Sequence, residues 1–169
     1  MNKNVRNMVL CGLFASLIAL CGWISITVPP LSFTMQTFGV LLTLGLLGGS
    51  RGFRAVAVYL LLGVVGLPVF ASFRGGAGAL LDPTGGFLWG FAVGALVYRL
   101  TEGLGKLPAM VACQGTIYLC GCLWFSRYAG VGLGGALLTC VVPYLVPDGV
   151  KLWLAWLLSR RMERHLKIG

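Results

Sequence analysis

Two ionisable residues, Asp148 and Lys151, lie three positions apart in the last long apolar stretch of the chain, LLTCVVPYLVPDGVKLWLAWLLSRR. The stretch carries no other charge before Arg160. An Asp or Lys in the hydrocarbon core of a membrane costs about 2.5–3.5 kcal/mol on insertion scales, and a spacing of three places both side chains on one helix face. We therefore expect a site for a polar small molecule, in which Asp148 accepts a hydrogen bond from a ligand N–H and Lys151 donates one to a ligand oxygen.

Two other interpretations of this pair are open from the sequence. The two residues would neutralise each other in a purely structural ion pair, or the lysine would extend its ammonium group toward the membrane surface. The second arrangement is awkward because Lys151 lies roughly two helical turns inward from Arg160. Pro143 and Pro147 precede the pair, and each removes a backbone donor and can kink a helix, which favours a cavity at this point.

Further candidate ligand contacts lie in two other parts of the chain. Gln36 is a polar amide in the apolar context FTMQTFGV, and it either reaches the ligand or caps a neighbouring helix. Pro83-Thr84-Gly85-Gly86 is typical of a helix start, whose positive dipole end would also favour an anionic ligand group. The aromatic residues that either line a pocket or pack in the core and at the membrane interface are Phe70, Phe73, Phe87, Trp89 and Tyr144.

The composition is that of an integral membrane protein rather than a soluble enzyme. Hydrophobic residues make up 58% of the chain, charged residues 10%, and the mean hydropathy is +0.92, whereas soluble domains average roughly 45–50% apolar and about 25% charged. The six cysteines lie in apolar runs without metal-binding spacing and are interpreted as packing residues. Hydrolase, zinc-protease and phosphate-loop motifs are missing from the sequence. We expect no catalytic residues, no metal, no cofactor and no ATP site of its own.

Six apolar spans predict an all-α integral membrane bundle of six transmembrane helices in a single membrane domain, 1–169. A span needs about 20 apolar residues, so the second and third spans are short, and only the turn Gly48-Gly49-Ser50-Arg51-Gly52 separates them. The expected spans are 6–27, 35–49, 52–67, 84–103, 108–128 and 137–159.

The basic residues predict how this bundle is oriented. Ten of the 13 Lys and Arg residues fall on one side of a six-span arrangement: Lys3, Arg6, Arg51, Arg54, Arg99, Lys106, Arg160, Arg161, Arg164 and Lys167. The opposite side receives Arg74 and Arg127, and Lys151 lies inside a span. Because cytoplasmic loops are enriched in Lys and Arg, we expect both termini in the cytoplasm. The net charge of +9 is attributed to this topology and not to nucleic-acid binding.

The two outer loops differ in length. The first, around 27–34, is kept out of a helix by Pro29 and Pro30. The second, 67–84, is long, apolar and rich in glycine. Irregular backbone near a membrane is tolerated where it is buried in protein or lines a cavity, and a long loop in a compact protein is usually functional. We interpret 67–84 as a lid over a site that opens outward.

Small residues recur along one face of the first span. Ala15 and Ala19 are separated by three residues, and Gly12 and Ser16 extend the face. Such a face lets another helix approach closely. The spacing alone indicates internal packing.

Four separated motifs are more specific together than any one of them. They are Phe33-Thr34-Met35-Gln36-Thr37-Phe38, Gly66-Leu67-Pro68-Val69-Phe70-Ala71, Asp82-Pro83-Thr84-Gly85-Gly86-Phe87 and Pro147-Asp148-x-x-Lys151. In this order, and over nearly the whole chain from Leu13, the sequence resembles the BioY family, the biotin-binding S components of energy-coupling factor (ECF) vitamin transporters. The resemblance implies six membrane helices in a prokaryotic cell membrane, high-affinity biotin binding, and partnership with a transmembrane coupling protein and two cytoplasmic ATPases.

The resemblance also assigns roles to residues. Asp148 and Lys151 fall on the acid and base that bind biotin, and part of the loop 67–84 falls on the lid over the ligand. The small face of the first span matches the docking motif for the coupling protein, so Gly12, Ala15, Ser16 and Ala19 become the predicted partner surface. The remaining residues of the predicted biotin site are Gln36, Phe70, Ser72, Phe73, Arg74, Gly75, Gly78, Thr84, Gly85 and Tyr144.

The sequence departs from the BioY pattern at two positions, and two alternative functions stay open. Many relatives carry glycine at the position of Asp82 and tyrosine at that of Phe87, and the added charge of Asp82 bears on how the biotin carboxylate is held. The carboxylate either meets Arg74 or a backbone N–H in the loops, or lies on Lys151 in the reverse pose. The alternatives are an S component for another small vitamin and a structural membrane protein in which the ion pair only fixes helix register.

Overall fold

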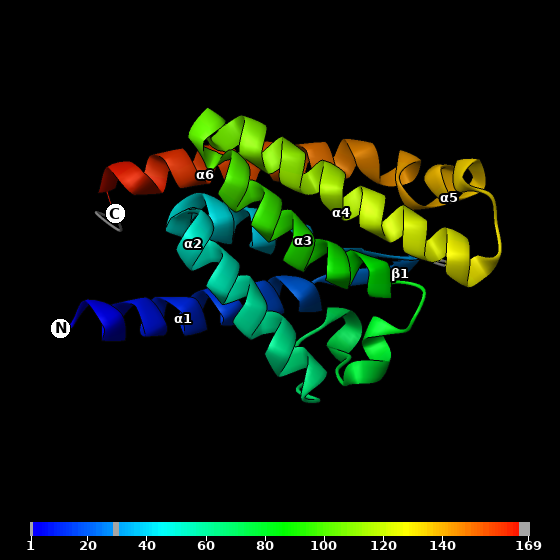
Figure 1. Ribbon diagram of the computed structural model, residues 1–169, viewed down its shortest axis with the longest axis horizontal. Helices are drawn as coiled ribbons and strands as arrows, with labels where there is room; N and C mark the ends of the chain where they lie inside the picture. Colours follow the sequence, from blue (N-terminus) through cyan, green and yellow to red (C-terminus); the bar gives the residue numbers. More distant parts are fainter. Residues whose placement is uncertain (1, 29–30, 166–169) are drawn as a thin grey trace.

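The computed structural model describes residues 2–28 and 31–165 of the chain, most of them in helices that run lengthwise through the molecule (Figure 1). Short 3₁₀ segments connect these helices at Ala71–Phe73, Ala77–Leu80, Glu102–Leu104 and Val142–Tyr144. The six α-helices of the described residues are α1 (Lys3–Trp23), α2 (Gln36–Val64), α3 (Gly85–Thr101), α4 (Lys106–Ala129), α5 (Leu133–Cys140) and α6 (Leu145–His165).

Several helical stretches of the described chain have the length and apolar composition that a membrane span requires. Four stretches are long and apolar enough to cross a membrane: Lys3–Trp23, Gln36–Val64, Lys106–Ala129 and Leu133–Glu163. Helix α3 is shorter, at 17 residues. The fold is thus mainly helical, as predicted, with long apolar helices of the kind that membrane proteins use.

Helix α2 is a hairpin of two helical segments. Gly48 leaves the helical conformation with a φ of 74°, which a residue without a Cβ adopts at little cost. The side-chain amide of Gln36 donates to the hydroxyl of Tyr59, although an unbroken helix would place residues 23 positions apart about 35 Å from each other. The two segments therefore run antiparallel, and the predicted turn between 35–49 and 52–67 is confirmed. The carboxylate of Glu102 accepts from the Gly49 N–H at 2.5 Å and holds this turn.

Glycines allow α3 and α4 to pack backbone against backbone. A Cβ added to Gly86 would lie 2.2 Å from the Trp124 side chain, and one added to Gly90 or Gly94 would lie 3.0 Å from α4 backbone atoms. The spacing of four places all three glycines on one face of α3. The two helices run side by side in Figure 1, and this close approach positions the polar residues of α4 next to the rest of the bundle.

The last predicted span, 137–159, is not one continuous helix. Helix α5 ends at Cys140, a 3₁₀ turn covers Val142–Tyr144, and α6 begins at Leu145. Pro143 lies in the 3₁₀ turn, where its missing N–H ends the α5 ladder. Pro147 lies in the first turn of α6, where a helix tolerates proline, so it causes no second kink.

The first outer loop contains strands, so the expectation of a purely α-helical chain is wrong in this segment. Helix α1 ends at Trp23 and not at 27, and β1 (Ser25–Val28) pairs antiparallel with β2 (Leu31–Thr34). β-Branched residues fill much of β1 and favour a strand. Pro29 and Pro30, the centre of the predicted loop, lie outside the described residues.

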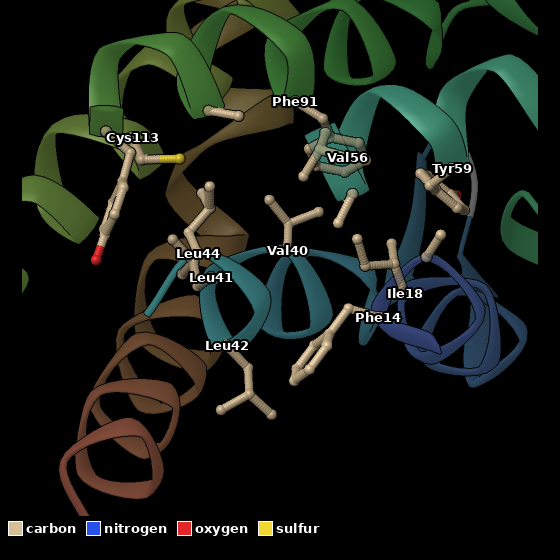
Figure 2. Packing of buried hydrophobic residues seen from close by; sticks show 14 of the residues in the cluster. Phe14, Ile18, Val40, Leu41, Leu42, Leu44, Val56, Tyr59, Phe91 and Cys113 are labelled. Atoms are coloured by element: carbon tan, nitrogen blue, oxygen red, sulfur yellow. The ribbon is translucent and has the colours of Figure 1, made fainter. Parts of the chain in front are cut away.

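The larger of two apolar clusters in the described chain joins α1, α2, α3, α4 and α6, and the smaller one lies between α4 and α5. Figure 2 shows Val40 of α2 pointing toward Val56 of the second α2 segment and Phe91 of α3, with Ile18 of α1 beside it and Phe14 of α1 on the other side of the α2 ribbon. All five side chains are buried. The burial of apolar side chains is the main favourable contribution to packing the helices together. The packed helices in turn position the loops at the ends of the bundle.

Both ends of the described chain lie at the same end of the bundle (Figure 1, left). The turn within α2 and the α3–α4 connection lie there as well, whereas the β1–β2 hairpin, the segment 67–84 and the α4–α5 connection lie at the opposite end. The segments predicted to carry most of the basic residues are therefore gathered at one end. Lys167, which was predicted for the same side, lies outside the described residues.

Candidate ligand site

The centre of the candidate site is a buried ion pair near the start of α6. Asp148 lies in the first turn of the helix, and Lys151 follows one turn later, with Lys151 Nζ 2.7 Å from Asp148 Oδ1. Their side chains are 7% and 6% exposed. The sequence-based expectation that both residues share one helix face is confirmed. A buried pair of this kind is stable only when its other hydrogen-bonding positions are also filled.

Neighbouring elements fill several of those positions. Asp148 Oδ2 accepts from the Tyr118 hydroxyl at 2.7 Å and from the side-chain amide of Gln114 at 3.4 Å. Lys151 Nζ donates to the Thr34 carbonyl at 2.7 Å and lies 3.8 Å from the centroid of the Phe33 ring. The pair is therefore held between α4 on one side and strand β2 on the other, which orients both charges.

A pocket opens beside this pair. Its empty volume, counting the solvent space at its mouth, is about 740 Å³. Its wall is mostly apolar, with polar groups at a few points. It is lined by Thr34, Gln36, Thr37, Phe70, Ala71, Arg74, Ala79, Thr84, Phe87, Leu88, Phe91, Ile117, Tyr118, Cys140, Tyr144, Asp148 and Lys151.

A second ion pair lies where the segment 67–84, which keeps the name of the predicted lid, meets the pocket. Arg74 Nη1 is 2.7 Å from Asp82 Oδ2, and Arg74 Nη2 donates to the Thr84 hydroxyl at 3.0 Å. The backbone of Asp82 is fixed from α4, because the indole N–H of Trp124 donates to its carbonyl at 2.9 Å. This outer pair is about two-fifths exposed. It links the segment 67–84 to the start of α3.

Gln36 and Phe70 join the pocket wall to the core. The Gln36 amide donates to Tyr59, whose hydroxyl donates to the Val69 carbonyl at 3.2 Å. The Phe70 ring packs edge-on against Tyr59 with centroids 5.7 Å apart. Gln36 therefore lies in the pocket wall, and its side chain binds a tyrosine hydroxyl and caps no helix among the described contacts.

The structure brings seven of the twelve predicted biotin-site residues to the pocket wall: Asp148, Lys151, Gln36, Phe70, Arg74, Thr84 and Tyr144. The other five lie outside it: Ser72, Phe73, Gly75, Gly78 and Gly85. Ser72 donates its backbone N–H to the Ser25 hydroxyl at 3.2 Å, and the Phe73 ring stacks on Trp23 with centroids 5.0 Å apart. Both residues thus fasten the lid to α1 and β1.

The three glycines of the lid region have different surroundings. A Cβ on Gly75 would meet the Leu67 carbonyl oxygen at 2.2 Å, and one on Gly85 would meet the Leu80 carbonyl oxygen at 2.1 Å. These two glycines therefore permit close backbone packing within the lid and at the start of α3. Gly78 has open space where a Cβ would be.

The sequence matches one known protein family over nearly its whole length. A sequence model of the BioY family matches residues 1–168 of the chain. The chain belongs to the BioY family. It is 39% identical over 165 residues to the biotin transporter BioY of Thermotoga maritima, covering 95% of this chain and 97% of that protein. It is 35% identical over 160 residues to the probable biotin transporter BioY of Pyrococcus horikoshii, with 94% and 96% covered.

A solved structure has the same fold. The S-component for biotin from an ECF-type ABC transporter superimposes with a TM-score of 0.86 over 97% of this chain and 95% of that one, at 24% identity. The family resemblance predicted from four short motifs is therefore confirmed over the full length. The BioY family is one of transporters, so the chain belongs to a class that is not enzymatic.

The predicted partner surface of this BioY-family chain is divided between two environments. Ala15 and Ala19 are 1% and 6% exposed and pack inside the chain, so in this conformation they serve the internal packing that their spacing indicated. Gly12 and Ser16 are exposed, and the Ser16 hydroxyl donates to the Gly12 carbonyl at 3.0 Å. Only these two of the four small residues are available to another helix.

Sequence reasoning missed the two α4 residues that bind Asp148. Gln114 and Tyr118 are four residues apart in the apolar segment VACQGTIYLC, a spacing that places both on one helix face. Polar residues within a membrane helix usually face the protein interior. That signal was available, but the sequence alone does not show that this face of α4 is directed at α6.

Proposed function

We propose that this chain is the high-affinity biotin-binding subunit of a vitamin uptake system. The observation that supports this most is the buried Asp148–Lys151 pair at one side of a mainly apolar pocket, in a chain whose relatives are named biotin transporters. Biotin has a polar ureido ring, an apolar thioether ring and an acidic side chain. These three parts match, in order, the charged inner end of the pocket, its apolar wall and the arginine at the lid.

The inner end has unused hydrogen-bonding capacity for the ureido ring. A carboxylate offers about four lone-pair positions and an ammonium group three donors. Asp148 Oδ1 accepts from Lys151 alone among the described contacts, and Lys151 donates to two oxygen acceptors. In the proposed pose Asp148 accepts from a ureido N–H and Lys151 donates to the ureido oxygen. The biotin carboxylate then lies toward Arg74, and the reverse pose places it on Lys151.

The remaining parts of the proposal concern the membrane. The chain forms six transmembrane helices, with α2 contributing two, in a prokaryotic plasma membrane. The end that contains both termini faces the cytoplasm, because cytoplasmic segments are enriched in Lys and Arg, and the lid end faces outward. Biotin is the transported ligand, and no resident cofactor or metal takes part.

Energy for transport is proposed to come from a partner. A transmembrane ECF coupling protein docks on the α1 side, where Gly12 and Ser16 are exposed, and two cytoplasmic ATPase subunits drive the cycle. The chain itself supplies the ligand site and no ATP site. The fold shared with an ECF-type S-component supports this assignment.

A second candidate function follows from the hydrogen-bond partners that the inner ion pair has within the chain. Asp148 and Lys151 bind each other, and each also has a partner within the chain. The same contacts would suit a structural ion pair, either in an S component for another vitamin or in a membrane protein without a ligand.

Isothermal titration calorimetry of the detergent-solubilised protein with biotin and a panel of other vitamins separates these candidates. The proposal predicts tight, saturable binding of biotin at one molecule per chain and none of the other vitamins. Tight binding of a different vitamin would replace biotin as the ligand. A monodisperse protein that binds no member of the panel would contradict the proposed function.

A further inference from the structure

Within residues 2–28 and 31–165, two buried side-chain polar atoms have no hydrogen-bond partner: Thr37 Oγ1 and Gln114 Oε1. Gln114 binds Asp148 through its other amide atom and is not part of the pocket wall. Thr37 is part of the wall. A buried hydroxyl without a partner is unfavourable in the empty protein, so its position beside a cavity requires an explanation.

The other hydroxyl, amide and charged side chains of the wall already have partners in the chain. Gln36 binds Tyr59, Tyr118 binds Asp148, and Thr84 accepts from Arg74. The Thr34 hydroxyl accepts from the Gln36 backbone N–H at 3.3 Å. Tyr144 stacks its ring on Phe33 and has a further interaction within the chain. Thr37 differs from all of these because no other group in the described chain uses its hydroxyl.

The position of Thr37 relates it to the charged end of the pocket. It lies in the first turn of α2, three residues after Thr34, whose carbonyl accepts from Lys151. The start of α2 and the ion pair of α6 thus meet at strand β2, and both contribute to the same wall. Thr37 and Lys151 thus line the same pocket.

We propose that the Thr37 hydroxyl forms a direct hydrogen bond with the ureido group of the bound ligand and selects for it. This inference rests on the proposed biotin-binding function. A hydroxyl is both donor and acceptor, as is a ureido group. A site with a buried polar group discriminates strongly against ligands that leave this group unpaired. Thr37 thus adds an uncharged contact to the charges of Asp148 and Lys151, and it disfavours ring systems that carry no polar head.

The test compares three variants by calorimetry with biotin and with desthiobiotin, which keeps the ureido ring and lacks the thioether. Thr37→Val keeps the shape and removes the hydroxyl, whereas Thr37→Ser keeps the hydroxyl. The matched control is Thr43→Val in the same helix, since the Thr43 hydroxyl is also buried but donates to the Gly39 carbonyl at 2.7 Å.

We expect Thr37→Val to weaken both ligands by the same factor, roughly five- to tenfold, as for the loss of one hydrogen bond. Its melting temperature without ligand should be no lower than that of the wild type, because an unpaired buried hydroxyl has been removed. Thr37→Ser should bind within about twofold of the wild type, and Thr43→Val should keep full affinity.

Three results would overturn the inference while leaving biotin binding intact. They are unchanged affinity in Thr37→Val, an equal loss in Thr37→Ser, or a loss for biotin without a loss for desthiobiotin. A wild type that binds neither ligand would contradict the proposed function itself, and with it the inference that rests on that function.

Discussion

The pocket has an ion pair at each end, and the two pairs have the same length but different surroundings. Asp148–Lys151 and Arg74–Asp82 both have a nitrogen–oxygen distance of 2.7 Å. The inner pair is 7% and 6% exposed and lies inside α6, while the outer pair is 41% and 43% exposed and lies in the lid segment. The two pairs are therefore equal in nitrogen–oxygen distance and differ in how much of each side chain is exposed to solvent.

Burial decides how each pair can act. An ion pair exposed to solvent contributes about 0–1 kcal/mol because water already stabilises both charges. For a buried pair, removing one partner leaves an uncompensated charge at a cost of about 3–5 kcal/mol. The inner pair therefore provides a fixed arrangement of charges. The outer pair can exchange its carboxylate for one from a ligand at low cost.

The largest expected difference between the two ends is the response to losing the cation. Lys151→Met leaves Asp148 buried with only neutral donors, so we expect a loss of stability of about 3–5 kcal/mol and no measurable biotin binding. Arg74→Met, the matched change at the outer pair, should cost less than about 1 kcal/mol and weaken binding without abolishing it. Thermal unfolding and calorimetry measure both, and equal effects at the two ends would refute the comparison.

An intermediate effect is expected from the donor that orients Asp148. Tyr118→Phe removes the hydroxyl that lies 2.7 Å from Asp148 Oδ2. Hydrogen bonds to charged groups contribute about 1.5–3 kcal/mol, so biotin affinity should fall roughly tenfold or more. The control is Tyr128→Phe, an exposed tyrosine of the same helix, which should bind normally. Calorimetry in which both variants bind like the wild type would show that the hydroxyl does not position Asp148 for the ligand.

The smallest effect is expected at the outer pair, and its sign is opposite. If the biotin carboxylate lies at Arg74, Asp82 competes with it for the same guanidinium. Asp82→Asn should therefore raise the affinity for biotin about two- to fivefold and leave the affinity for the neutral biotin amide unchanged. Titration of both ligands measures the ratio. A parallel change for acid and amide would instead place the carboxylate elsewhere, as in the reverse pose.

Much of the inner end could be predicted from the sequence, because charge in an apolar run is a strong signal. Asp148, Lys151 and the turn at Gly48 followed from residue type and spacing and agree with the structure. Tyr118 and Gln114 were missed because their role depends on which face of α4 is directed at α6. That relation is tertiary and has no marker in a single sequence.

The outer end was harder to predict because its backbone is irregular. Ser72 and Phe73 both have positive φ, 57° and 58°, a conformation that side-chain patterns do not reveal for residues other than glycine. This geometry is found where the two residues contact Ser25 and Trp23 rather than the pocket wall. The β1–β2 hairpin was missed for a related reason, since the prolines excluded a helix from the loop without showing that strands form there.

The central claim is that the inner ion pair serves ligand binding, and the double variant Asp148→Asn/Lys151→Met tests it most directly. Because it leaves no buried unpaired charge, it should be more stable than Lys151→Met alone and unfold at a temperature close to that of the wild type. The account predicts that this folded double variant binds no biotin in a calorimetric titration. Biotin binding close to that of the wild type would contradict the account and make the pair a purely structural feature.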